Sequence, residues 1–261
     1  MNRANVLGVG VHAVNLTLAA DLIIQAASSD KKGYVCVTGV HGVMEAQRNS
    51  QFKNVLDHAL LVVPDGMPTV WIGHWEGYKD MGRVFGPELM FEVCQRSITS
   101  GHKHFLYGGN PGVAEQLKLN LKKQFPGIQI VGTYTPPFRP LTPPEKADLQ
   151  AQVAFLTPDI IWIGLSTPKQ EKFMAESITD LNCKVMIGVG AAFDIHTGRV
   201  QDAPRWIKNA GLQWLHRLCQ EPSRLWKRYL VNNSGFVVRT ALQLFGLKRY
   251  KLVSPQTSVE Y

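Results

Sequence analysis

Asp65 is the residue whose position first suggests chemistry, and it lies in the stretch Leu60 to Thr69, LLVVPDGMPT. The apolar run before it predicts a short buried strand that ends at the carboxylate. Ligands of parallel α/β sheets bind beyond the carboxyl ends of the strands, so Asp65 could act there as a general base. The alternative is structural, because Asp is also a favoured N-cap residue of a following helix. The two roles do not exclude each other.

Further candidate site residues follow other predicted strands, so they could share a cleft with Asp65. Gly108 and Gly109, in LYGGNPGVAE, allow close backbone approach before a helix start that suits phosphate or ribose, or they form a plain tight turn. Gln170 can both donate and accept hydrogen bonds, which suits a sugar. Asp194 could accept from a base or a sugar hydroxyl, or could anchor its own loop.

Two further polar residues lie near predicted element ends. Thr38 ends the second predicted strand, and Arg83, in GRVFGPEL, precedes a predicted helix. An isolated Arg is often only the partner of a surface ion pair, so that interpretation of Arg83 stays open.

The sequence lacks the motifs of several other kinds of active or metal-binding site. The sequence contains no D-x-D motif that would hold a metal against a diphosphate, no G-x-S-x-G and no P-loop motif. Its four cysteines form no C-x-x-C pair, which argues against a zinc site or a disulfide framework. His102 and His104 are close in sequence, but we interpret them as surface residues rather than as metal ligands. We therefore expect neither a metal nor a cofactor.

The stretch GVGVHA, Gly8 to Ala13, formally matches a dinucleotide-binding loop after a strand. Such a site needs an acidic residue about 20 residues further on, at the end of the second strand. This chain has Thr38 there. An NAD-linked oxidoreductase therefore stays only as an alternative.

Short apolar runs alternate with amphipathic segments, and this alternation predicts the elements that position the candidate residues. It is typical of an α/β fold, a Rossmann-like and mostly parallel sheet with helices on both faces. The predicted strands are Val6–Val9, Tyr34–Thr38, Leu60–Val63, His104–Tyr107, Ile128–Val131, Ile160–Ile163 and Val185–Val189. The predicted helices are Leu16–Ala27, Pro87–Thr99, Val113–Phe125, Pro144–Leu156 and Gln170–Ser177. The segment Thr133–Lys146 contains five prolines, which predicts a surface connection. Near its end, Thr142 and Glu145 resemble a capping box for the helix that follows.

The net charge of +8 is confined to the C-terminal part of the chain. Residues 1–198 contain 17 Lys and Arg and 17 Asp and Glu, whereas residues 199–251 contain 11 cations and two anions. We predict a catalytic body, residues 1–198, and a basic amphipathic appendage, residues 199–261. Its helices are expected at Pro222–Leu230 and Gly235–Lys251, with a break around Asn233–Gly235. Such an appendage indicates an anionic partner: phosphate groups, an acidic membrane surface or nucleic acid.

Nucleic acid is the second alternative, because aromatic residues alternate with the cations, as in single-strand binding surfaces. The chain contains no recognised nucleic-acid module, and we expect no nucleic-acid partner. The N-terminus shows no signal-peptide pattern, and no run reaches about 18 apolar residues, so we expect no membrane-spanning segment.

Six stretches together resemble the WecG/TagA/CpsF glycosyltransferases, glycosyltransferase family 26, from about Val6 to Leu230. They are VPDGMP, GRVFGPELM, LYGGNPGVAE, GLSTPKQEKF, GVGAAFDIHTGRVQDAPRWIKNAGLQWLHRL and EPSRLWKRYL. The resemblance implies an inverting, metal-independent transfer from a UDP-sugar to a polyprenyl-diphosphate-linked saccharide. It also implies a peripheral protein at the cytoplasmic face of the bacterial plasma membrane that makes teichoic acid, capsule or exopolysaccharide. Self-association of the body when the appendage is disengaged is a further implication.

The resemblance also assigns roles to residues. Asp65 matches the family's catalytic aspartate and Thr38 its pocket threonine. The matches to its pocket arginine, its pocket glutamine and its diphosphate-binding appendage arginines are Arg83, Gln170, Arg217, Arg224 and Lys227. Two positions depart from the family pattern. Val40 replaces a pocket Asn, whose contact is lost or supplied by His41, and Lys227 replaces an arginine, whose role neighbouring Arg228 could take.

Overall fold

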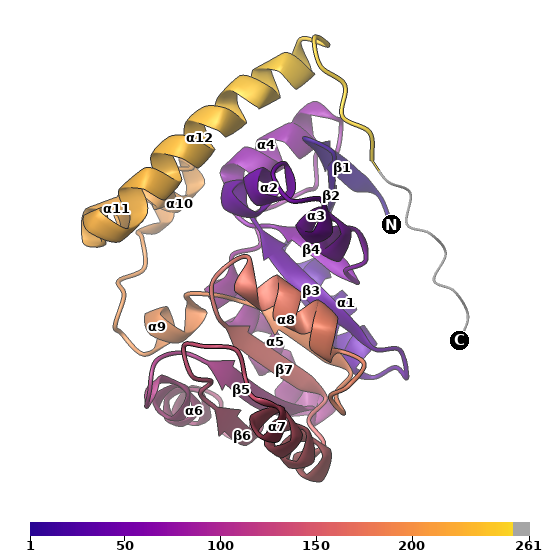
Figure 1. Ribbon diagram of the computed structural model, residues 1–261, viewed down its shortest axis with the longest axis vertical. Coiled ribbons are helices and arrows are strands. Elements are labelled where there is room, and N and C mark those ends of the chain that lie inside the picture. Colours follow the sequence, from indigo (N-terminus) through magenta and orange to yellow (C-terminus); the bar gives the residue numbers. More distant parts are fainter. Residues whose placement is uncertain (253–261) are drawn as a thin grey trace. The chain divides into compact units, whose positions relative to one another are not determined.

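The computed structural model describes residues 1–252, and the chain forms two compact units (Figure 1). The first unit comprises Met1–Asn15, Thr38–Val84 and the chain from Ala203 onward. The second comprises Leu16–Val37 and Phe85–Asp202. The chain passes between the units several times, so each is assembled from segments distant in sequence.

The second unit is built on parallel strands. Five strands lie side by side in the order β3 (Gly33–Thr38), β8 (Val185–Gly188), β7 (Ile160–Gly164), β5 (Lys103–Gly108) and β6 (Gln129–Tyr134). Each neighbouring pair is parallel, with Ile160 opposite both His104 and Val185. The central strands are buried almost throughout. Burial on both faces explains why they appear in the sequence as continuous apolar runs.

Helices cover both faces of these strands. In Figure 1, α7 and α8 lie in front of the strands, and α1 and α5 lie behind them. The helices of this unit are α1 (Leu16–Ala27), α5 (Gly86–Ser100), α6 (Val113–Gln124), α7 (Pro143–Leu156), α8 (Lys169–Ser177) and α9 (Ala192–His196). The predicted Rossmann-like α/β fold is confirmed, and the predicted helices agree with these to within a few residues.

The prediction that His102 and His104 lie on the surface is wrong. Both are buried. His104 is the second residue of β5, which is paired on both sides, and His102, just before β5, has its Nε2 3.1 Å from Ser28 Oγ. His104 Nδ1 accepts a hydrogen bond from Trp162 Nε1 at 2.9 Å. Burial, with a smaller contribution from His102, lowers the pKa of His104 to about 3, so its ring is neutral at physiological pH.

The first unit begins with an antiparallel hairpin, β1 (Arg3–Val6) and β2 (Val9–His12). Leu7 and Gly8 have φ of +53° and +79°, as a tight hairpin turn requires. The prediction of a single strand Val6–Val9 is therefore wrong. GVGVHA forms a hairpin turn and its second strand rather than a loop that opens a helix, which removes the basis of the dinucleotide alternative.

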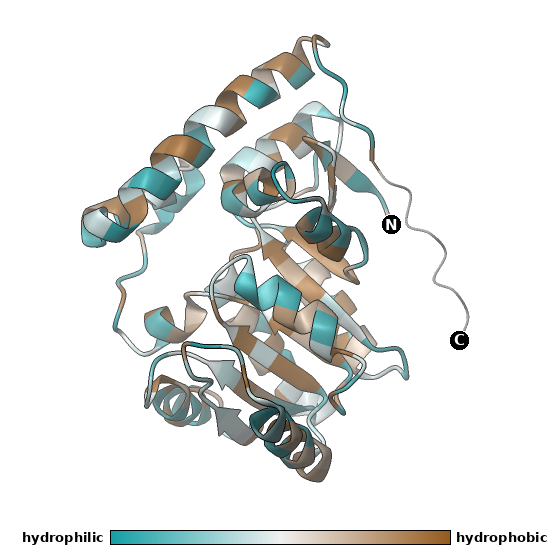
Figure 2. Ribbon diagram, in the orientation of Figure 1, coloured by the Kyte–Doolittle hydropathy of each residue, from teal (hydrophilic) through white to brown (hydrophobic). Residues whose placement is uncertain are grey.

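The rest of the first unit is mainly helical. Its remaining elements are α2 (Val40–Ala46), α3 (Ser50–Asp57), β4 (Leu61–Pro64), α4 (Met67–Trp75), α10 (Arg205–Asn209), α11 (Gln213–Gln220) and α12 (Pro222–Leu244). Apolar and polar residues alternate along α12 (Figure 2). Of the helices within residues 1–252, none has both the length and the apolar character needed to cross a bilayer.

The predicted break around Asn233–Gly235 is wrong, because α12 is one continuous helix of 23 residues. A Cβ added at Gly235 would lie 2.9 Å from Met44 Cε, so the glycine allows α12 to pack closely on α2. Asn232 is buried in the same contact. Residues of low helix propensity here mark a helix–helix contact rather than a loop, since packing overrides propensity.

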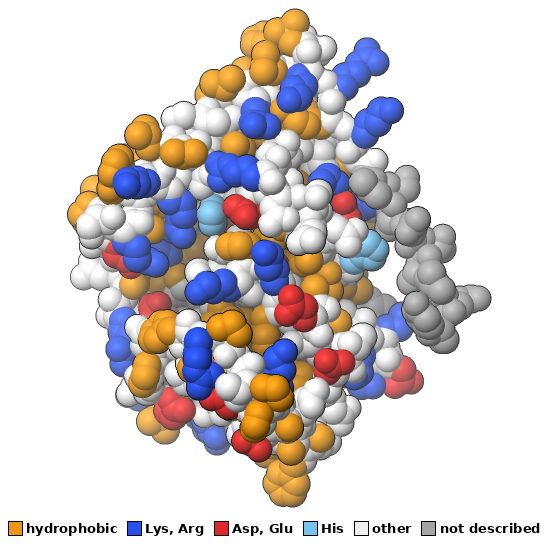
Figure 3. Space-filling model, viewed as in Figure 1, with side chains coloured by type: hydrophobic (Ala, Val, Ile, Leu, Met, Phe, Trp, Pro, Cys, Tyr) orange, Lys and Arg blue, Asp and Glu red, His pale blue; other side chains and the backbone are white. Residues whose placement is uncertain are grey.

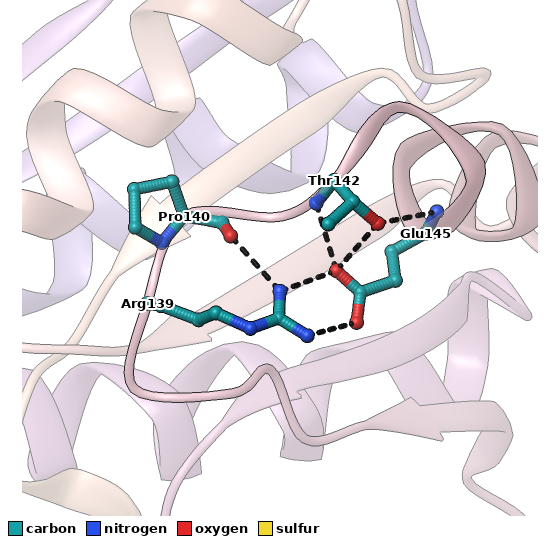
Figure 4. A network of polar contacts seen from close by, with 4 residues as sticks. All are labelled: Arg139, Pro140, Thr142 and Glu145. Carbon is teal, nitrogen blue, oxygen red and sulfur yellow. Dashed lines mark hydrogen bonds and ion pairs between the residues drawn. The ribbon is translucent and has the colours of Figure 1, made fainter.

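The proline-rich connection ends in the predicted capping box, which is confirmed (Figure 4). Glu145 Oε2 accepts from the backbone N–H of Thr142 at 2.7 Å, and Thr142 Oγ1 accepts from the backbone N–H of Glu145 at 3.5 Å. Arg139 donates two hydrogen bonds to the same carboxylate, at 2.7 and 2.8 Å. The Arg139 bonds first, and then the Thr142 backbone bond, lower the pKa of Glu145 to about 2.

We expect Thr142→Ala to lower the free energy of unfolding by about 1 kcal/mol, because α7 loses its N-cap. Urea unfolding at neutral pH measures this change. Thr142→Ser keeps the capping oxygen and should stay close to the parent protein. An equal loss of stability in both variants would show that the cap does not hold this helix.

Candidate active site

Three segments that carry predicted site residues meet in the first unit. The backbone N–H of Asp65, directly after β4, donates to the carbonyl oxygen of Thr38 at 3.0 Å. The N–H of Val84 donates to the carbonyl oxygen of Pro64 at 2.8 Å. Arg83, next to Val84, is therefore held on a segment that touches the residue before Asp65. The structure thus brings together the backbone of Thr38, Asp65 and Arg83.

Two glycines allow this close approach. A Cβ added at Gly39 would lie 2.5 Å from the carbonyl oxygen of Asp65. A Cβ at Gly42 would lie 2.9 Å from the Cγ2 methyl of Thr38. Real Cβ atoms do not approach this closely, so both positions need glycine for the observed geometry. The sequence analysis missed both residues, although TGVHG shows them.

Gly66, not Asp65, is the N-cap residue of α4. Gly66 has φ of +95° and, as a glycine, no side chain to cap the first turn of the helix, which contains Pro68. The first-turn N–H groups of α4 therefore begin just after Asp65. Asp65 itself is half-buried and lies one residue before the cap, so the capping alternative does not account for the carboxylate.

The predicted appendage cations lie on α11 and α12, around Glu221 at their junction. The Glu221 carboxylate pairs with Arg217 at 3.6 Å and with Arg224. Lys227 Nζ lies 5.4 Å from the centroid of the adjacent Trp226 ring. Arg228 likewise lies over the Tyr229 ring, with Cζ 5.5 Å from its centroid. The structure thus gathers Arg217 and Arg224 around one carboxylate.

A buried polar contact joins α12 to the helix that follows Thr38. Asn232 Nδ2 lies 2.9 Å from His41 Nδ1, and Arg48 donates a hydrogen bond to Asn232 Oδ1. Asn232 is only 3% exposed, so breaking this contact would leave a buried amide without partners. The basic helix is therefore anchored on α2, whose N-cap Gly39 directly follows Thr38. The sequence analysis missed Asn232 because it assigned the neighbouring residues to a loop.

The remaining predicted residues lie in the second unit, where Gly108 and Gly109 lie at and just after the end of β5. Gly109 N–H donates to the carbonyl oxygen of Gly164 at 3.1 Å, and a Cβ at Gly108 would lie 2.6 Å from that oxygen. Their φ values are +129° and +76°. The close backbone approach that these glycines permit is therefore to Gly164 at the end of β7, and a ligand contact of either glycine stays a prediction.

Gln170 and Asp194 differ in how the protein uses them. Gln170 is 3% exposed; its Oε1 accepts from Gly190 N–H and its Nε2 donates to Glu171 Oε1, both at 3.0 Å. Gln170 thus ties α8 to the loop after β8. Asp194 is half-buried on α9, and its carbonyl oxygen accepts from Arg199 N–H at 2.8 Å. Within residues 1–252 no hydrogen bond engages its carboxylate, which is therefore available to a ligand.

A cavity of about 220 Å³ lies at the opposite, amino end of the parallel strands. Its lining includes Lys32, Asp159 and Lys184, which precede β3, β7 and β8. It is separate from the residues that follow the strands. Across residues 1–252 no three His, Cys, Asp or Glu side chains are grouped as metal ligands.

Comparison with known proteins gives two results. The family model described as "Glycosyl transferase WecG/TagA/CpsF family" matches residues 4–250, a range that contains every predicted site residue. A curated relative from Bacillus spizizenii is named N-acetylglucosaminyldiphosphoundecaprenol N-acetyl-beta-D-mannosaminyltransferase. This chain is 28% identical to it over 186 residues, which cover 71% of this chain and 70% of the relative.

We expect Gly39→Ala to lower kcat/KM for glycosyl transfer by about 100-fold, the effect of misplacing a catalytic group by about 1 Å. The added methyl group would push against the carbonyl oxygen of Asp65. The control is Gly10→Ala in β2, whose methyl group meets only the flexible side chain of Arg3. Equal rates for the two variants would show that the Gly39 contact does not position Asp65.

Proposed function

Because the chain belongs to the WecG/TagA/CpsF family of glycosyl transferases, we propose that it transfers a sugar from a UDP-sugar to a polyprenyl-diphosphate-linked saccharide. The observation that carries the proposal is the carboxylate of Asp65 at the end of β4, bonded through its backbone to Thr38. The name of the Bacillus relative supports the acceptor class and suggests N-acetylmannosamine as the donor sugar to test first.

The proposed chemistry is a single in-line displacement with inversion at the anomeric carbon. Asp65 takes the proton from the acceptor hydroxyl as that oxygen attacks the anomeric carbon, and the bond from this carbon to the UDP oxygen breaks. Arg83, whose backbone segment meets that of Asp65, is proposed to contact the sugars. Thr38 is only 2% exposed, so we assign it the positioning of Asp65, whose backbone N–H donates to its carbonyl oxygen. Arg83 would supply positive charge close to the reacting centre.

Negative charge grows on the diphosphate as UDP leaves, and we assign its stabilisation to side-chain cations without a metal. Arg217 and Arg224 already share one carboxylate, that of Glu221, which shows that both can reach a common anion. Lys227 and Arg228 follow on α12, which contains no Asp or Glu. Guanidinium groups suit diphosphates because their forked N–H groups bind two oxygens at once.

The second unit contains the remaining predicted site residues. The carboxylate of Asp194 can accept from a ribose or base, since the described protein leaves it unbonded. Gln170 holds the Gly190 loop, so its role is to position that loop. Gly108 and Gly109 remain predicted contacts. The division into a body, residues 1–198, and an appendage, residues 199–261, also stays a prediction, as does self-association.

The basic helix is proposed to dock on an anionic membrane surface at the cytoplasmic face of the bacterial plasma membrane. Trp226 is 48% exposed and Leu230 62%, and Val237 adds a third exposed apolar side chain at helical spacing. Figure 3 shows hydrophobic side chains along the outer edge of α12 and cations beside them. Helices of this kind lie in the interface with their apolar side in the lipid.

Asp65→Asn should lower the transfer rate by about 100- to 10,000-fold, the contribution of a general base. The assay uses UDP-N-acetylmannosamine with an N-acetylglucosaminyl-diphosphate-polyprenol acceptor, with and without a chelator. The exposed Asp80→Asn in the same unit is the control. UDP should still raise the melting temperature of Asp65→Asn, because binding and proton removal are separate. A fully active Asp65→Asn would refute the assignment, and loss of parent activity with chelator would refute metal independence.

Trp226→Ala combined with Leu230→Ala should weaken binding to phosphatidylglycerol vesicles by about tenfold or more, since each buried apolar side chain contributes about 1.5–3 kcal/mol. Vesicle co-sedimentation measures the change. Leu119→Ala on α6, another exposed leucine, is the matched control. Unchanged binding of the double variant would show that this face of α12 does not enter the membrane.

A further inference from the structure

We propose that the outer face of α4 binds the isoprenoid chain of the acceptor lipid and guides it to Asp65. This inference rests on the proposed transfer to a polyprenyl-diphosphate-linked saccharide. It concerns Met67, Trp71 and Trp75, together with Leu212 and Leu215, which follow the turn at Gly211 that packs on Trp71 and Met67. We call this set the α4 lane.

The α4 lane follows one side of a helix. Met67, Trp71 and Trp75 are spaced by four residues, so their side chains lie above one another on the same face. The Trp71 side chain is 49% exposed and that of Trp75 is 59% exposed. The opposite side of α4, which includes Val70 and Ile72, is buried. Two large aromatic side chains therefore face solvent on a helix whose other side already belongs to the core.

The lane starts at the catalytic carboxylate. Met67 is the first residue of α4 and lies two positions after Asp65. The nine residues of α4 extend over about 13 Å at 1.5 Å per residue. An acceptor whose hydroxyl reaches Asp65 would place its saccharide and diphosphate along the first turn, where the N–H groups have no side-chain cap. Its chain would then continue over Trp71 and Trp75.

The turn between α10 and α11 forms a second wall. A Cβ added at Gly211 would lie 2.7 Å from Cη2 of Trp71 and 3.4 Å from Cβ of Met67, so this turn packs directly on the lane. Leu212 and Leu215, which follow the turn, are 39% and 42% exposed. Apolar side chains of α4 thus lie against the turn that leads into α11, and all of these residues belong to the first unit.

The side chains of the α4 lane and its position next to Asp65 favour an isoprenoid chain as the bound group. Flat indole rings pack well against a branched, unsaturated hydrocarbon, and tryptophan is favoured where an apolar chain meets a polar head group. Residues 199–251 carry 11 cations against two anions, which complements a lipid with a diphosphate head. A bilayer surface fits less well, because the α4 lane begins two residues from Asp65, where the acceptor itself must lie.

The test compares acceptors that differ only in chain length. The saccharide diphosphate is linked either to an undecaprenyl chain or to a short alkyl chain, and kcat/KM is measured for both in detergent. The parent protein should prefer the long chain. In Trp71→Ala combined with Trp75→Ala the ratio of long-chain to short-chain kcat/KM should fall at least about tenfold, through a higher KM, since one buried aromatic side chain is worth this much.

Two further variants guard against misfolding. Trp75→Ala alone alters the more exposed residue and should show a smaller loss of preference, and replacement of both residues by Phe should restore most of it. Phe155→Ala on α7, an exposed aromatic outside the lane, is the matched control. An equal fall for both acceptors, or an unchanged ratio, would overturn the proposal. Loss of vesicle binding with an unchanged ratio would assign the tryptophans to the bilayer instead.

A binding measurement separates this proposal from the proposed function. Polyprenyl diphosphates of increasing length, without a saccharide, are titrated into the parent protein and the double Ala variant by calorimetry. Affinity that rises with chain length in the parent but not in the variant supports the lane even if no sugar is transferred. Affinity independent of chain length in the parent would overturn the lane even if transfer is observed.

Discussion

The hydrogen bond from the backbone of Asp65 to Thr38 is the constraint on which the candidate site depends. It joins Asp65, which directly follows β4, to Thr38, and both residues belong to the first unit. Each lies at the carboxyl end of its strand, where ligands of parallel sheets bind. The bond is possible only because Gly39 has no Cβ to meet the Asp65 carbonyl oxygen. A backbone contact of this kind fixes the main chain from which the carboxylate extends, whereas a residue on a free loop would have to be ordered when substrate binds.

Much of this arrangement could be predicted from the sequence, because buried parallel strands leave continuous apolar runs and their ends are marked by glycine and polar residues. The Asp65 position, the capping box at Thr142 and the α/β class follow from such local signals. The failures share one cause, which is tertiary contact. His104 is polar, yet it is buried in a strand that is paired on both sides. Asn232 and Gly235 suggest a loop in the sequence, but in the structure they lie in a helix at its contact with α2. A pattern within one segment does not reveal what packs against it.

The glycines near the strand ends also show that a sequence pattern does not reveal which atoms pack against a residue. Gly108 is conspicuous in the sequence and suggested a phosphate site; the structure gives its missing side chain a packing reason, the carbonyl oxygen of Gly164, and the phosphate contact stays a prediction. Gln170 suggested a sugar contact, but its amide holds the Gly190 loop. Glycines and buried amides also serve backbone packing, so the neighbouring atoms are needed to tell this role from ligand binding.

Glu221 gives the basic appendage an internal counterion. Because Arg217 and Arg224 already share its carboxylate, an anion that reaches them enters by exchange rather than by simple addition. The free energy of that exchange is the difference between pairing the two arginines with the incoming anion and pairing them with Glu221. A weakly charged anion therefore gains little from it. A group with several negative charges gains most, because it can hold both guanidinium groups and still leave oxygens for other donors. If the junction of α11 and α12 binds the diphosphate as proposed, the pairing of Glu221 with both arginines would favour multiply charged anions over singly charged ones.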